Sequence, residues 1–329
     1  MAKMTIEGLK TFVKTYVAAG KQAGAWVSTT DNLLKLQDKI GKQITLDGSF
    51  QDKLPELSGD ELPLGKTIEE WFIDLTLPSE FDATGKDNDS PAYPSVEDVA
   101  YCYTLGRKKI KTSEPYDNVE RAALTPEDAA SMTGKIMERI QNSESLYEFN
   151  LKKQLLGNMA DKAIAVNTAI TDATEREKYG TVKVVALPDT TENAENAILE
   201  LKKAVEDASF AHQGNCMAGK DALIGASPEL TLYVKKGFMP SVEVKAFAGA
   251  FQKEELAIPC TIKVVDDIPC TDTKVWGVLV DPRGIKLHPG YKAMRSHENA
   301  DGDFINYVLH TEFTGFISKY TFVRVFKTA

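Results

Sequence analysis

Apolar side chains recur every three to four residues in several stretches of the chain, a spacing that places them on one face of a helix. The first stretch, Ile6 to Val17, follows a capping residue, Thr5, and ends before Gly20. Another begins at Thr125 to Asp128, where a proline and two acids suit a helix N-terminus. A separate start at Ser145 predicts a long helix with an apolar face formed by Leu146, Phe149, Leu156, Met159, Ala163 and Ile164.

Runs of β-branched and aromatic residues predict a pair of strands in the first third of the chain. Leu64 to Leu77 is a long strand candidate, and Val99 to Leu105 is a second one. About twenty residues rich in proline, glycine, asparagine and serine separate them. The sequence therefore predicts a β-hairpin with a long polar tip. Before it, Ala23 to Ser58 mixes a brief helical stretch with glycine-containing turns, and we expect an extended arm there rather than a packed element.

Strands and helices alternate beyond Gly180. A helix is expected from about Thr191, and its buried face consists of Ala194, Ala197, Ile198, Leu201, Ala204, Val205 and Ala208. Strands are expected at Thr181–Leu187, Leu230–Val234, Thr261–Val265 and Lys274–Val280. Two final β runs, Asp303 to Phe313 and Lys319 to Lys327, are predicted to form a hairpin that turns at Gly315. Strands interleaved with helices indicate an α/β or α+β body around a sheet.

Composition adds limits to this picture. The chain has 329 residues, of which 43% are hydrophobic and 26% charged, as in ordinary globular proteins. Intrinsic disorder and collagen-like structure are excluded on this ground. No window approaches the roughly 18 consecutive apolar residues of a membrane helix, and Met1 to Thr5 does not open a signal peptide. We therefore expect a protein that is made and folds in a cytoplasm, with no membrane partner.

Charge is distributed in blocks along the chain. The net charge of -9 argues against a dedicated nucleic-acid binder, which normally carries a basic surplus. Residues Leu54 to Asp98 hold twelve acids and two lysines, a net of -10 that accounts for the whole imbalance. A basic cluster follows directly, formed by Arg107, Lys108, Lys109 and Lys111. Opposite charges therefore lie in adjacent blocks, which we interpret as the two sides of one projecting hairpin.

The motifs of common enzymes and metal sites are missing from the sequence. There is no G-x-G-x-x-G, P-loop or G-x-S-x-G motif, and no recognisable nucleophile surrounds any of the four histidines. Four widely spaced cysteines without a C-x-x-C pair argue against zinc and disulfide frameworks. Asn299 to Asp303 has its glycine misplaced for a calcium loop and is predicted to be a turn. No catalytic residue, cofactor or metal is expected.

The projecting hairpin is the candidate for a contact between subunits. Its stem contains Trp71, Phe72, Tyr101 and Tyr103, which have little to pack against within one subunit. The acidic tip could bind a divalent cation, although a solvated loop is the more common role of such a tip. The basic cluster could meet phosphate, pair with the acidic block of another copy, or be a solvated strand edge. The candidate contact residues are Glu69, Glu70, Trp71, Asp82, Asp87, Asp89, Arg107, Lys108, Lys109 and Lys111.

The order of these elements resembles the tailed-bacteriophage major capsid proteins of the Hong Kong 97 fold, especially the major head proteins of small short-tailed podophages. The run Leu62 to Glu70, with Asp74 to Thr76, looks like the start of that family's extended loop. Val278 to Asp281 and the aromatic stretch Phe304 to Phe326 are similar to its closing strands. The resemblance rests on order and spacing from about Leu62 onward, and the first 60 residues match only loosely.

This resemblance implies an α+β, Hong Kong 97-like capsid fold in four parts. They are an N-terminal arm (1–61), an extended loop (62–112), a peripheral domain with the spine helix (113–180 and 273–329) and an axial domain (181–272). The implied function is a non-enzymatic shell protein that forms hexamers and pentamers, with the extended loop lying over a neighbour. The implied partners are further copies of the chain, a scaffolding protein, a portal, and packaged double-stranded DNA bound without sequence readout.

The resemblance also implies a place, the virion capsid, which is assembled in the host cytoplasm. Two alternatives stay open at this point. The first is an encapsulin-like compartment shell, which would enclose an enzyme instead of a genome. The second is a soluble α/β enzyme with an unrecognised site. The cargo separates the two kinds of shell, and the size of the particle in solution separates both of them from the enzyme.

Overall fold

The structure is a computed structural model in which the chain forms two compact units. Among the described residues, the first unit draws on 50–51, 110–143 and 294–309, and the second on 52–109, 144–293 and 310–329. The predicted helix at Ile6 to Val17 lies outside the described residues. The structure describes residues 50–62, 67–73, 93–101, 104–115, 126–210, 213–219, 229–238, 240–241, 258, 260–299, 301–302 and 304–329.

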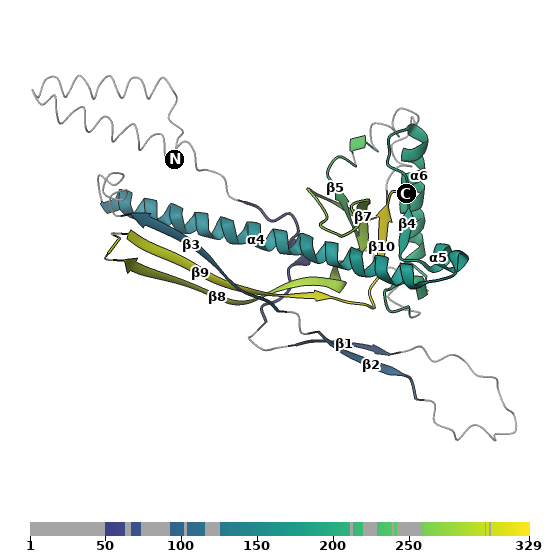
Figure 1. Cartoon of the computed structure of the whole chain (residues 1–329), viewed down its shortest axis with the longest axis horizontal. Coiled ribbons are helices and arrows are strands. Elements are labelled where there is room, and N and C mark those ends of the chain that lie inside the picture. The colour runs from purple at the N-terminus through teal and green to yellow at the C-terminus, as the bar shows by residue number, and fades with distance from the viewer. Residues whose placement is uncertain are drawn as a thin grey trace, which may run out of the picture. The chain divides into compact units, whose positions relative to one another are not determined.

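The second unit contains a five-stranded sheet, of which Figure 1 labels β4, β10, β7 and β5. Its strands occur in the order β4-β10-β7-β5-β6, and β7 runs antiparallel to both of its neighbours. The inner strands are almost entirely buried, as continuous runs of Val, Leu and aromatic residues require. The bounds of the five strands are β4 Val182–Val184, β5 Thr231–Lys235, β6 Thr261–Val265, β7 Val275–Val280 and β10 Val323–Lys327.

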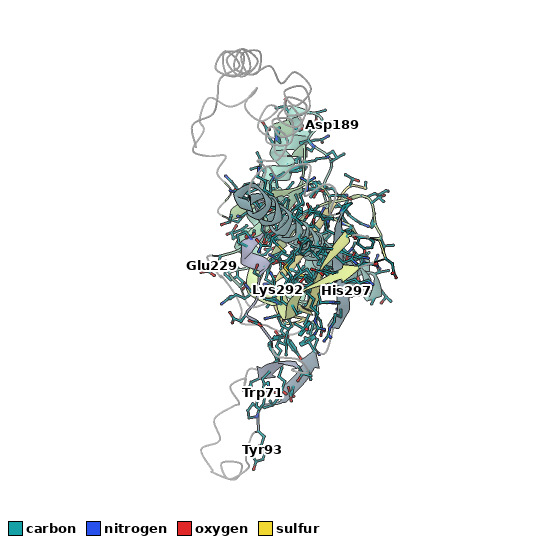
Figure 2. The ribbon with its side chains drawn as sticks, turned by 90° about the vertical axis from the view of Figure 1, so that its left-hand side faces the viewer. Trp71, Tyr93, Asp189, Glu229, Lys292 and His297 are labelled. Atoms are coloured by element: carbon teal, nitrogen blue, oxygen red, sulfur yellow. The ribbon has the colours of Figure 1, made fainter. Side chains whose placement is uncertain are left out.

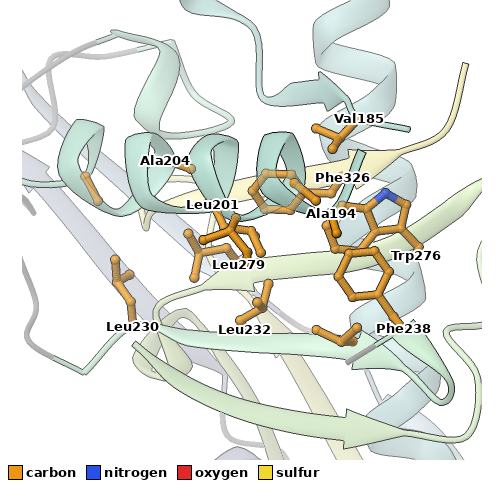
Figure 3. Close-up of a cluster of buried hydrophobic side chains, with 14 of the residues drawn as sticks. Val185, Ala194, Leu201, Ala204, Leu230, Leu232, Phe238, Trp276, Leu279 and Phe326 are labelled. Atoms are coloured by element: carbon orange, nitrogen blue, oxygen red, sulfur yellow. The ribbon is translucent and has the colours of Figure 1, made fainter. Parts of the chain in front are cut away.

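Helix α6, Thr191–Asp207, packs its apolar stripe on this sheet (Figure 3). The Thr190 hydroxyl accepts a hydrogen bond from the amide of Asn193 and so caps the helix. The predicted apolar face is confirmed: Ala194, Ala197, Ile198, Leu201, Ala204 and Ala208 are buried, and Val205 packs beside them. Trp276 of β7 stacks on Phe238, which follows β5, with the ring centroids 3.9 Å apart, and the pair completes this core.

A single helix, α4, runs 44 residues from Pro126 to Ala169. The prediction of a separate helix start at Ser145 was therefore wrong. Serine and glutamate at this spacing can cap a helix, but they are also compatible with a helix interior. Nearby, the Ser143 hydroxyl donates to the Arg139 carbonyl four residues earlier, a bond that serines make within helices. None of the described helices is long and apolar enough to cross a membrane.

One short helix and two of the three described turns of 3-10 helix also begin at residues that suit a helix N-terminus. Helix α5, Ala173–Tyr179, was not predicted, although Asp172 caps it by accepting bonds from the amides of Thr174 and Glu175. Single turns of 3-10 helix occur at Pro55–Leu57, Gln213–Asn215 and Pro282–Gly284. Two of these three turns begin with proline, which suits the first position of a helix.

A second sheet has the strand order β3-β9-β8, with β3 Thr104–Pro115, β8 Ile285–Asn299 and β9 Phe304–Ile317. In the first unit, the α4 residue Ile140 and the β9 residues Tyr307 and Leu309 form a small core. The predicted turn between β8 and β9 is confirmed, because the Asn299 side chain accepts from the amides of Asp301 and Gly302.

The predicted terminal hairpin was wrong. Strand β9 continues through Gly315 to Ile317, and β10 belongs to the five-stranded sheet. Gly315 serves close packing instead of a turn, because a Cβ there would lie 2.7 Å from Leu155 of α4. The sequence signal was a glycine between two β runs, which is compatible both with a turn and with close packing inside a strand.

Residues 52–58 are packed within the second unit rather than forming an extended arm, which corrects the expectation for this part of Ala23 to Ser58. Leu54 and Leu57 are fully buried. The buried Lys152 ammonium of α4 bonds to Asp52, to Glu148 at 2.7 Å and to the Ser58 hydroxyl at 2.7 Å. This network holds the segment against the long helix.

Candidate assembly surface

Strands β1, Ile68–Ile73, and β2, Val96–Tyr101, form an antiparallel hairpin. The pairing places Ile73 opposite Val96 and Ile68 opposite Tyr101. Successive side chains of a strand point to opposite faces, and burial alternates accordingly along both strands. The predicted hairpin is thus confirmed, with shorter strands than the sequence indicated. The hairpin has one face turned to the solvent and one turned to the rest of the second unit.

The solvent face of the hairpin is apolar. Trp71 is 67% exposed, Ile73 57% and Val96 53%. Glu69 and Asp98 flank them on the same face. Tyr93, just before β2, is 85% exposed, and Figure 2 shows it on the hairpin together with Trp71. Large exposed aromatic side chains of this kind are enriched at the centres of protein interfaces.

The other face of the hairpin packs on the turn that follows β9. The Phe72 ring stacks on Tyr320 with centroids 4.7 Å apart and an interplanar angle of 6°. The Tyr320 hydroxyl donates to Glu97 at 2.6 Å. The Ser318 hydroxyl donates to Glu70. Both glutamates of this face therefore accept hydrogen bonds from the body of their own subunit.

Tyr101 lies at the base of the hairpin and belongs to the same contact. Its hydroxyl donates to Glu70 at 2.9 Å, and its ring packs edge-on against Phe316 at 5.1 Å. Burial raises the pKa of Tyr101 well above its usual value, and the hydrogen bond to the Glu70 carboxylate raises it further. The phenol consequently remains a protonated donor at every physiological pH.

The basic cluster lies on β3 and not on the hairpin, so the interpretation of two charged sides of one hairpin was wrong. Strand β3 pairs with β9 in the other sheet. Arg107 forms an ion pair with Glu312 at 3.2 Å and stacks over the Tyr291 ring at 4.2 Å. The remaining members of the cluster, Lys108, Lys109 and Lys111, are exposed.

The structure separates the predicted contact residues into three groups. Trp71 and Glu69 face the solvent, whereas Glu70 is bonded within its own subunit. The tip residues Asp82, Asp87 and Asp89 lie outside the described residues. Sequence reasoning missed Ile73 and Val96, although the two-residue period that starts at Trp71 contains the signal for both. It also missed Ser318 and Tyr320, for which no local signal exists.

The described residues contain no group of three or more His, Cys, Asp or Glu side chains that could hold a metal ion. Cys260 and Cys270 are free thiols. Burial raises the pKa of Cys260 to about 11 and also raises that of Cys270. Both thiols are therefore protonated at neutral pH, which does not suit a nucleophile.

Comparison with known proteins identifies similar chains. Residues 20–327 match the family model described as the Phi29-like phage major capsid protein. The chain is 21% identical to the major capsid protein of Bacillus phage PZA over 302 residues, which cover 88% of this chain and 62% of the relative. It is 23% identical to that of Bacillus phage B103, covering 90% and 65%. The chain thus spans less than two thirds of the length of these curated relatives.

Solved capsid structures share the fold. A chain from the capsid of Staphylococcus phage Andhra superimposes with a TM-score of 0.64 at 13% identity, over 86% of each chain. A chain from Mycobacterium phage Bobi gives a TM-score of 0.54 at 13% identity, over 87% of this chain and 93% of the other. The expected α+β fold of the Hong Kong 97 type is confirmed.

Proposed function

The chain belongs to the family of Phi29-like phage major capsid proteins, and on that premise we propose that it assembles with copies of itself into the icosahedral shell of a phage head. The family match over residues 20–327 carries this proposal. The exposed apolar face of the hairpin supports it, because such a face is typical of a contact between subunits. The proposed role is structural and requires neither a cofactor nor a catalytic residue.

Sedimentation of the purified full-length protein tests this function. At micromolar concentration we expect rings and closed shells that sediment far faster than a 36.2 kDa monomer. Many weak contacts acting together stabilise such particles. A protein that remains monomeric at all concentrations, with or without a scaffolding protein, would contradict the proposal and favour a soluble enzyme. Enzyme cargo in place of DNA would favour the encapsulin-like alternative.

The remaining partners are part of the same proposal. Membership of the family supports double-stranded DNA as the content of the shell, and a scaffolding protein and a portal as partners during assembly in the host cytoplasm. A net charge of -9 suits a shell that encloses DNA without gripping its phosphates. The protein would reside in the virion capsid.

We keep the division into a peripheral and an axial domain as a proposal, with one change. Strands β7 and β10 fall within the segment 273–329, which the sequence assigned to the peripheral domain. They are hydrogen-bonded in one sheet with β4, β5 and β6, so we place them in the axial domain. Helix α4 takes the role of the spine helix, and the hairpin β1-β2 that of the extended loop.

Within the shell, we propose that the solvent face of the hairpin lies on a neighbouring subunit. Trp71, Ile73 and Val96 supply the apolar part of that contact. Electrostatic attraction between exposed lysines of β3 and acids of the neighbour's hairpin would steer the approach. Because Arg107 and Glu70 already have partners within their own subunit, Lys108, Lys109 and Lys111 on one side and Glu69 on the other carry this attraction.

Reversing two of these charges tests the electrostatic part. We expect Lys108→Glu with Lys109→Glu to slow assembly at least tenfold, and Glu69→Lys added to that pair to restore part of the rate, as measured by light scattering. Wild-type assembly should also slow as salt rises to a few tenths molar, where the Debye length falls below about 8 Å. The matched control reverses two exposed lysines elsewhere, Lys162→Glu with Lys236→Glu. Equal rates for the two double variants would show that the basic cluster is only solvated surface.

A further inference from the structure

We propose that the turn after β9 is a seat that sets the direction of the hairpin, and that Glu70, Phe72 and Glu97 are positioning residues for assembly. The seat is defined by Phe316, near the end of β9, and by Ser318, Lys319 and Tyr320 of the turn. This inference rests on the proposed function, since the direction of the hairpin matters only if its solvent face must meet a neighbour.

The contact is made of several interactions that constrain different directions. The parallel stacking of Phe72 on Tyr320 fixes the distance between β1 and the turn. The bond from the Tyr320 hydroxyl to Glu97 at 2.6 Å holds β2, and the Lys319 ammonium lies 3.8 Å from the same carboxylate. Because the two strands are held at separate points, these contacts oppose rotation of the hairpin about its long axis relative to the turn.

The base of the hairpin is held by a third group. Glu70 accepts from both the Ser318 and Tyr101 hydroxyls. Tyr101 in turn packs its ring edge-on against Phe316. A carboxylate with two hydroxyl donors is well satisfied away from bulk water, and hydrogen bonds to a charged group are stronger than neutral ones.

The seat itself is rigid. Ser318 is fully buried, and its amide donates to the Gly284 carbonyl at 2.7 Å. Its hydroxyl oxygen accepts from the amides of Tyr320 at 3.0 Å and Thr321 at 3.2 Å while donating to Glu70. Tyr320 is only 1% exposed. A hairpin bonded to such a turn takes its direction from the body.

The hairpin depends on this support. A two-stranded hairpin alone is at best marginally stable in water. Because alternate residues face opposite sides, docking Phe72 and Glu70 on the seat determines that Trp71 and Ile73 point away from it. The seat therefore does two things: it stabilises the hairpin, and it presents the apolar face outward.

Hydrogen exchange on dilute, unassembled full-length protein tests the seat. We expect Phe72→Ala with Glu97→Gln to speed the exchange of amides in 68–73 and 96–101 at least tenfold, with exchange in β5 and β7 unchanged. The conservative variant Phe72→Tyr, which keeps an aromatic ring, should exchange as the wild type does. The matched control Ile73→Ala with Glu69→Gln alters the solvent face of the same hairpin and should leave exchange unchanged. Unaltered exchange in the first variant would overturn the proposal.

Assembly supplies the second measurement. The Phe72→Ala, Glu97→Gln variant should form shells at least tenfold more slowly than the wild type, and Phe72→Tyr should form them at the wild-type rate. Fast hairpin exchange combined with normal assembly would show that the seat holds the hairpin without positioning it, and would overturn the inference. If the wild type itself never assembles, the proposed function fails, whereas the exchange result still reports on the contact.

Discussion

Replacing Trp71 by glutamate should abolish shell assembly and leave the subunit folded. The indole is 67% exposed in the single subunit, so folding loses little when it is removed. In an interface the same side chain would be a central aromatic anchor, whose loss typically costs about 2 kcal/mol or more per contact. The new carboxylate would also be buried without a partner. Repetition of the contact around a shell multiplies both effects.

The matched control is Leu199→Glu, because Leu199 is 49% exposed on α6 and is not part of the proposed contact. Both variants should give the wild-type circular dichroism spectrum. In sedimentation, only the Trp71 variant should lack fast-sedimenting particles. Shells formed at the normal rate by Trp71→Glu would show that the solvent face of the hairpin is not a subunit contact.

Gly157→Ala should destabilise the folded subunit strongly. A Cβ at this position of α4 would lie 2.0 Å from the Pro269 carbonyl oxygen, a backbone atom that cannot rotate away. Overpacking of this kind lowers the free energy of unfolding by about 1–3 kcal/mol or more, since α4 and the segment around Pro269 must move apart. The glycine is therefore required for the close approach of the helix to the segment before β7. Urea unfolding of the unassembled protein measures the loss.

Gly134→Ala is the control in the same helix, and it should raise the free energy of unfolding, whereas Gly157→Ala should lower it. Apart from its chain neighbours and the backbone of its own helix, no atom of the described residues lies within 4 Å of the Cβ that this substitution adds. Alanine is favoured over glycine in a helix interior by about 0.5–1 kcal/mol, so the variant should be slightly more stable than the wild type. If both alanine variants shift the midpoint equally, the packing of α4 against Pro269 is not as described.

Elements with a strong local pattern could be predicted from the sequence. The buried face of α6 and the bounds of β6 agree with the expectation, because a regular period of apolar residues reports the face that packs. The β-branched and aromatic residues around Trp71 likewise predicted a strand there. The expectation that Phe72 and Tyr101 have little to pack against within one subunit was wrong, because they contact Tyr320 and Phe316. The start of α4 at Pro126 was also predicted, since proline and acids at a helix N-terminus act locally.

Long-range pairing could not be predicted in this way. Arg107 bonds to Glu312, 205 residues away in the sequence. The residues around Arg107 contain no signal that indicates Glu312 as its partner. Adjacency of charge in the sequence therefore suggested a hairpin partner that the β3-β9 pairing excludes. For the same reason Glu70 was predicted to be a contact with a neighbour, whereas Ser318 holds it within the subunit. The local sequence pattern determines which face each side chain of a strand occupies. It does not determine which other strand pairs with that strand.

The position of β10 in the five-stranded sheet has a consequence for the order of folding. This strand comes after the other four strands of the sheet in the sequence, yet it lies between β4 and β7 in the strand order. A ribosome adds about 5–20 residues per second and releases the N-terminal parts first. The sheet therefore cannot close while β10 is still being synthesised. A newly made chain lacks the strand between β4 and β7 until β10 emerges, which delays contacts between subunits until translation has passed that point.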